Sequence, residues 1–103
     1  MTIKKVGEAM LKKTYFPDLE RHYVAFTHSR HYPKLERLNN WGKQRFFLAQ
    51  YFDLVEDSYD LQQIVLRYQQ HYIYLDIAQA PDFMKKVPYL SWLRQQLERQ
   101  ALV

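Results

Sequence analysis

The chain has 103 residues, enough for one hydrophobic core and too few for two, so residues 1–103 are expected to form a single domain. Apolar residues make up 48% of the sequence and charged residues 25%, a balance typical of folded proteins and not of disordered ones. Cysteine is absent, which excludes disulfides, thiolate catalysis and cysteine-based metal centres. The net charge of +4 is uneven: residues 1–50 carry ten Lys/Arg against four Asp/Glu, and residues 51–103 carry five against seven.

No segment of the sequence is suited to membrane insertion. Nowhere do about 18 consecutive apolar residues occur, so no membrane span is expected. The opening sequence MTIKKVGEAMLKK also lacks an apolar stretch long enough for the core of a signal peptide. Together with the absence of cysteine, these patterns predict a cytoplasmic protein.

Three helices are expected in the first forty residues, separated mainly by prolines. The first covers residues 2–14, where four apolar side chains share one helical face. A second should begin at Pro17, where a first-turn proline costs no hydrogen bond, and end near His31. Pro33 should open a third, short helix. The expected inward residues are Ile3, Val6, Met10 and Leu11, then Leu19, Tyr23 and Phe26, then Leu35 and Leu38.

Longer helices are expected over residues 43–56 and 58–79, and a last one from Pro88 onward, because apolar residues recur there at helical spacing. Residues 71–77 also alternate at period two and are rich in strand-forming residues, but the continuous upstream pattern favours helix. The apolar positions are Phe47, Leu48, Tyr51, Phe52, Leu54 and Val55, then Leu61, Ile64, Val65, Tyr68, Tyr72 and Leu75, then Leu90, Leu93 and Leu97.

These helices predict an all-α fold, a compact bundle or orthogonal array of five to six helices. Glycine occurs only at Gly7 and Gly42, and neither lies between two alternating apolar runs. The usual turn residues of tight hairpins are therefore missing, which disfavours an all-β fold.

Residues 28–45 combine cations, amides and aromatic rings with a single acid, and we call them the basic-aromatic corner. Cations bind phosphates, amide and guanidinium groups read bases, and aromatic rings stack on unpaired bases. The alternative is a solvated helix surface with Trp41 in the core. The candidate binding residues are Arg30, His31, Tyr32, Lys34, Arg37, Asn40, Trp41, Lys43 and Arg45.

A second candidate surface lies on the predicted helix over residues 58–79. Leu66, Ile73 and Ile77 fall off its main apolar stripe, so the helix would be apolar on two sides. A helix of this kind is either central in the fold or at an oligomer interface. Together with Tyr74, these residues form a candidate interface in a homodimer.

Metal and catalytic sites are not expected. His22, His28 and His31 do not share one helical face with a carboxylate, so no metal ligand set is predicted. The acidic run of Asp53, Glu56, Asp57 and Asp60 is typical of helix capping and solvation, and alternatively it could meet the basic-aromatic corner of a second copy. No nucleophile is paired with a base, so no catalytic residue, cofactor or enzymatic activity is predicted.

Two functions follow from these features. The first is a non-enzymatic regulatory or adaptor protein that binds another protein or itself, since Tyr, Trp and Arg are the residues that anchor protein interfaces. The second is a DNA- or RNA-binding helical module that uses the basic-aromatic corner.

Overall fold

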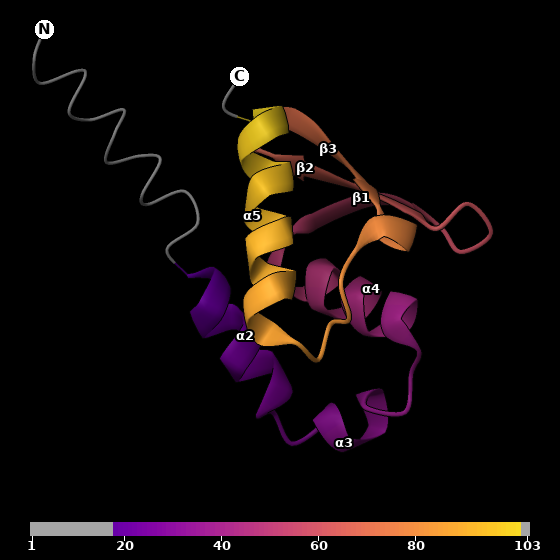
Figure 1. The fold of residues 1–103 in the computed structure, drawn as a ribbon, viewed down its shortest axis with the longest axis vertical. Helices are drawn as coiled ribbons and strands as arrows, with labels where there is room; N and C mark the ends of the chain where they lie inside the picture. Colours follow the sequence, from indigo (N-terminus) through magenta and orange to yellow (C-terminus); the bar gives the residue numbers. More distant parts are fainter. Residues whose placement is uncertain (1–17, 102–103) are drawn as a thin grey trace, which may run out of the picture.

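The computed structural model describes residues 18–101, which form an α+β fold (Figure 1). Three helices come first, then a three-stranded antiparallel sheet in the order β1-β2-β3, then a short 3-10 helix and a last α-helix. The elements are α2 (Leu19–Thr27), α3 (Tyr32–Leu35), α4 (Asn40–Tyr51), β1 (Asp53–Ser58), β2 (Gln63–Tyr68), β3 (His71–Asp76), η1 (Ile77–Gln79) and α5 (Lys86–Ala101). The helix expected over residues 2–14 lies outside the described residues.

The all-α prediction is wrong. All three strands of the sheet lie in the two segments, 43–56 and 58–79, where long helices were expected. The first of them ends at Tyr51, since Phe52 has extended backbone angles (φ −135°, ψ 166°) and β1 follows directly. Residues 58–79 form the end of β1, then β2, β3 and η1. The period-two alternation of residues 71–77 was the correct signal, since Ile73, Leu75 and Ile77 are buried between exposed neighbours.

A two-residue turn without glycine joins β2 to β3. Tyr68 pairs with His71, and the intervening Gln69 and Gln70 both have positive φ, at 50° and 70°. This is the backbone geometry of a type I′ hairpin turn, which Asn-Gly normally occupies. The hairpin could not be predicted from the sequence, because two glutamines take backbone angles that glutamine rarely adopts.

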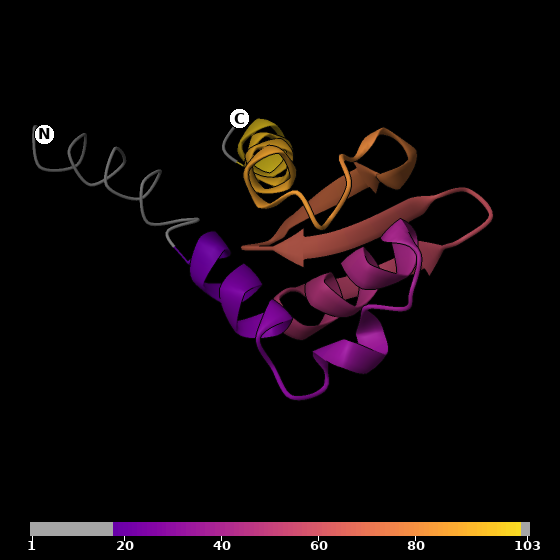
Figure 2. The same ribbon diagram turned by 60° about the horizontal axis from the view of Figure 1, so that its bottom comes forward.

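The sheet has one face in the core. Ile64 pairs with Leu75 and Leu66 with Ile73, and all four side chains are fully buried in the main core cluster. The helices cover this inner face: α5 contacts β3, and α2 contacts both α5 and α4. Figure 1 shows α5 in front of the strands, and Figure 2 shows the same helix almost end-on above them.

Aromatic rings fill the space between the helices. Phe47 of α4 lies 5.5 Å from Phe26 of α2, 5.5 Å from Phe83 and 6.4 Å from Tyr89 of α5, measured between ring centroids. Most of these pairs meet edge to face, the arrangement that the ring quadrupole favours. The expected stripe of α2 is confirmed, since Leu19, Tyr23 and Phe26 are its buried residues.

The last helix follows the sequence pattern at Leu93 and Leu97, which are buried as expected, whereas the expected Leu90 is half-buried and Tyr89 is buried beside it. It begins at Lys86, two residues before Pro88, and buries Tyr89, Leu93, Leu97 and Ala101. Among residues 18–101, no helix is long and apolar enough to cross a membrane.

Candidate interaction surfaces

Two residues of the basic-aromatic corner, Tyr32 and Asn40, make contacts that hold the fold together. The Tyr32 side chain is 6% exposed and its hydroxyl donates to Met84 Sδ at 2.7 Å. The Asn40 side chain donates to the carbonyl of Pro81 at 3.2 Å and accepts from the N–H of Phe83 at 2.6 Å. These contacts fasten residues 81–84 to α3 and α4, so neither side chain is available to a ligand.

Three further corner residues, all half-buried, are also engaged within the chain. The Trp41 ring packs edge-on against Tyr59 at 5.2 Å, and Lys43 Nζ donates to the carbonyl of Leu38. Arg45 Nε lies 2.7 Å from Asp57 Oδ2. The acidic run does meet the corner at this point, but within one chain and across α4 and β1.

The exposed remainder of the corner is Arg30, His31, Lys34 and Arg37. These four residues belong to α3 or to the turns beside it, and α3 lies at the lower end of the molecule in Figure 1. The nine candidate residues therefore divide into five with structural contacts and four that face solvent.

The predicted oligomer interface divides in a similar way. Leu66 and Ile73 are fully buried and Ile77 is 2% exposed, all in the core of a single chain. Tyr74 is 55% exposed. The argument from two apolar faces of one helix fails because the segment is a hairpin, and the core covers its inner side.

The outer face of the sheet carries a surface that the helical interpretation missed. Strand alternation and register place three cross-strand rows there. Tyr72 and Tyr74 of β3 are 52% and 55% exposed, whereas Val65, which pairs with Tyr74 on β2, is 6% exposed and lies outside the main core cluster. The described helices thus leave this face open. Its rows are Asp53–Arg67–Tyr72, Glu56–Val65–Tyr74 and Ser58–Gln63–Asp76.

The outer face carries more acids than bases. Arg67 is its only cation, and this guanidinium lies 2.8 Å from Asp53. Glu56 on β1 and Asp76 at the end of β3 are exposed and add two further carboxylates to this face. The combination is an apolar centre at Val65, two tyrosine rings and an excess of negative charge.

Both edges of the sheet are protected against a further strand. The side-chain amide of Gln100 on α5 bonds the N–H and the carbonyl of Tyr74 on β3. On β1, a bulge at Val55 shifts the register between Leu54 and Glu56. Bulges and covered edges are means by which proteins prevent strand addition, so the outer face, not an edge, is the open surface.

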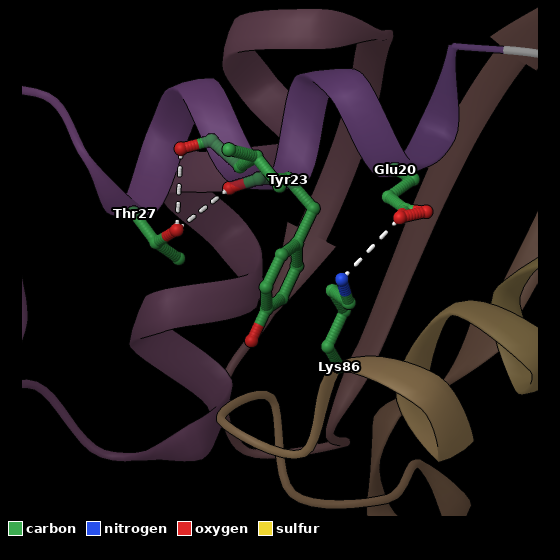
Figure 3. Close-up of polar contacts among 5 residues, drawn as sticks. Glu20, Tyr23, Thr27 and Lys86 are labelled. Carbon is green, nitrogen blue, oxygen red and sulfur yellow. Dashed lines mark hydrogen bonds and ion pairs between the residues drawn. The ribbon is translucent and has the colours of Figure 1, made fainter.

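Figure 3 shows polar contacts within α2 and one ion pair between α2 and the start of α5. Lys86 Nζ lies 3.3 Å from Glu20, and the Thr27 hydroxyl donates to the carbonyl of Tyr23 at 3.0 Å. The Tyr23 hydroxyl donates to the carbonyl of Phe83 at 2.9 Å. A shallow depression of about 260 Å³ lies beside the ion pair, lined by Glu20, Lys86, Val87, Leu90, Ser91 and Arg94.

Three tyrosine hydroxyls of residues 18–101 have raised pKa values. Burial raises the pKa of Tyr23, Tyr32 and Tyr89, with a smaller contribution from Asp82 at the first two. These hydroxyls therefore stay protonated and cannot act as bases near neutral pH. Within residues 18–101, no three His, Asp or Glu side chains come together as metal ligands would.

Comparison with protein-family models, with curated proteins and with solved structures gives no significant match. Function must therefore be argued from the surfaces of this chain alone.

Proposed function

We propose that this protein is a non-enzymatic interaction module that binds another protein across the outer face of its sheet. The observation that supports the proposal is the pair of half-exposed tyrosines on β3, Tyr72 and Tyr74, beside Val65 of β2 on a face that the described helices leave open. Tyrosine is enriched among the residues that dominate binding energy at interfaces, because its ring buries a large area with few rotatable bonds.

The chemistry of the face indicates a basic partner. Glu56 and Asp76 are exposed on the same face as the two rings, and Arg67 is already matched by Asp53. A Lys or Arg on the partner would gain both a carboxylate and the face of a tyrosine ring. Nucleic acid is disfavoured at this face, since its phosphates would meet uncompensated carboxylates.

A second copy of the chain is one candidate for the partner, and the homodimer stays a prediction. Its remaining support is the exposed Tyr74, since Leu66, Ile73 and Ile77 belong to the core, and the acidic outer face of one copy would have to meet basic residues of the other. Sedimentation of the full chain across a concentration range tests it: a mass of one chain throughout would restrict the partner to another protein.

Photo-crosslinking in cells tests the proposed face. A photoreactive phenylalanine derivative at position 74 should give a discrete adduct, and one at position 46 should not. Phe46 is a matched control because it is 44% exposed but lies on α4. Adding Glu56→Lys to the position-74 probe should abolish the adduct, since the reversal repels a basic partner. Equal crosslinking from positions 46 and 74, or none from 74, would contradict the proposal.

A further inference from the structure

Cations without partners are concentrated around α3. Within residues 18–101, the Lys and Arg side chains that make no ion pair and no side-chain hydrogen bond are Arg30, Lys34, Arg37 and Lys85. Three of these four lie within eight residues of one another, and all four are exposed. We call Arg30, Lys34 and Arg37 the α3 stripe.

The three cations of the α3 stripe lie in and beside one short helix. Lys34 belongs to α3 (Tyr32–Leu35), and Arg30 and Arg37 lie in the turns before and after it. Backbone hydrogen bonds keep this segment compact: the Lys34 N–H donates to the carbonyl of His31, and the Glu36 N–H donates to that of Tyr32. One nucleic acid strand carries a phosphate every 3.4 Å or so, so three cations held close together can contact up to three neighbouring phosphates.

Core contacts of Tyr32 and Leu35 fix the backbone that carries the α3 stripe. Tyr32 points inward, with its ring 5.6 Å from that of Phe26 and its hydroxyl on Met84. Leu35 packs against the core on the same inner side. The cations therefore project from a fixed support, which lowers the conformational entropy lost when they bind.

We propose that the α3 stripe is a second binding site, for the phosphodiester backbone of nucleic acid, separate from the outer face of the sheet. The corner's aromatic rings are not available for stacking, because Tyr32 is buried and Trp41 packs on Tyr59. Binding is therefore independent of base sequence and rests on charge. A membrane surface fits less well, since an exposed apolar side chain that could insert is missing from the stripe itself.

Two acids near the α3 stripe, Glu36 and Asp82, limit its affinity for phosphates. Glu36 lies between Lys34 and Arg37 in the sequence, and Glu36 and Asp82 are both exposed. Both also contribute to the raised pKa of the Tyr32 hydroxyl, after burial and Tyr23, so their carboxyl groups lie near this part of the fold. Three phosphate contacts predict a log–log salt slope of about −2 to −3 for the affinity.

Matched charge reversals in the full chain test the inference. The probes are a mixed-sequence 20-base-pair DNA duplex and a 20-nucleotide single strand, measured by fluorescence anisotropy at 50 mM salt. Arg30→Glu with Arg37→Glu should weaken binding about tenfold or more. Arg21→Glu with Arg99→Glu makes the same change in net charge at exposed positions away from α3, and should weaken binding less than about threefold.

The expected results are salt-dependent binding of both probes and selective loss in the α3 variant, with an unchanged circular dichroism spectrum. A variant with Lys4, Lys5, Lys12 and Lys13 all changed to Gln should keep that selectivity. Equal losses in the two double variants would overturn the inference, as would binding that depends only on the four N-terminal lysines. It would also be overturned by no binding at low salt, or by binding to phosphatidylserine vesicles without binding to either probe.

Discussion

The side-chain amide of Gln100 pairs with the backbone of Tyr74 as a neighbouring strand would. The Tyr74 N–H donates to Gln100 Oε1 at 2.7 Å, and Gln100 Nε2 donates to the Tyr74 carbonyl at 2.9 Å. One residue of α5 thus satisfies the middle of the β3 edge and ties the helix to the strand that carries both exposed tyrosines.

Gln100→Ala should therefore open this edge. We expect a loss of about 1 kcal/mol in the free energy of unfolding, the scale of exposed hydrogen bonds, together with greater association at high concentration. Urea denaturation and light scattering measure the two effects. Gln95→Ala, at an exposed position on the same helix, should change stability by less than about 0.5 kcal/mol. Equal effects of the two changes would show that the amide pairing contributes nothing.

Substitutions in the β2–β3 turn should stabilise the fold. Gln69→Asn with Gln70→Gly supplies the residues that positive φ favours, and should raise the free energy of unfolding by about 1 kcal/mol. The urea midpoint measures the gain. Gln95→Gly is the opposing control, since glycine inside α5 should cost about 1 kcal/mol. A destabilised Asn-Gly variant would rule out the type I′ turn.

Two buried tyrosines should respond oppositely to loss of the hydroxyl. The Tyr89 hydroxyl is buried without a hydrogen-bond partner among residues 18–101, whereas that of Tyr23 donates to the Phe83 carbonyl. Tyr89→Phe should therefore be neutral or slightly stabilising, and Tyr23→Phe should cost about 1 kcal/mol because it orphans a buried carbonyl. Thermal unfolding of both variants measures the difference. The reverse order of stability would contradict the core packing described above.

Alkaline pH should destabilise the fold through the same tyrosines. Burial raises the folded-state pKa of Tyr23, Tyr32 and Tyr89 above the unfolded value of about 10. Above that pH the unfolded chain loses phenolic protons that the folded chain retains, so the free energy of unfolding falls as pH rises. Urea titrations between pH 9 and 11 measure the fall, which should be smaller in Tyr89→Phe. A flat profile would mean that these hydroxyls are not buried.

The sequence predicted the helical half of this fold better than the sheet. The stripe of α2 and the inward leucines of α5 could be found because each helix buries one face at regular spacing. The sheet could not be found in this way. Its buried residues alternate along two short strands, and when the turn between them is overlooked the apolar positions of this stretch also fit helical spacing. The buried residues are Ile64, Leu66, Ile73 and Leu75. Gln69 and Gln70 did not indicate that turn, because glutamine is not a typical turn residue.

The candidate surfaces show a similar division. Local composition located the α3 stripe, since cations that are close in sequence stay close in a helix. It could not show that Arg45 faces Asp57, because that pair forms only when β1 folds back beside α4. Nor could it identify the outer face, where Glu56, Val65 and Tyr74 come from three strands.

The most direct test of the proposed function is the affinity of the purified chain for the protein that crosslinks at position 74, measured by isothermal titration calorimetry. Replacing both Tyr72 and Tyr74 with Ala should weaken binding by at least about thirtyfold, or roughly 2 kcal/mol, the scale of interface anchors. Phe46→Ala should leave the affinity within about twofold. Unchanged affinity in the double tyrosine variant, with its circular dichroism spectrum intact, would contradict the claim that the outer face of the sheet is the binding surface.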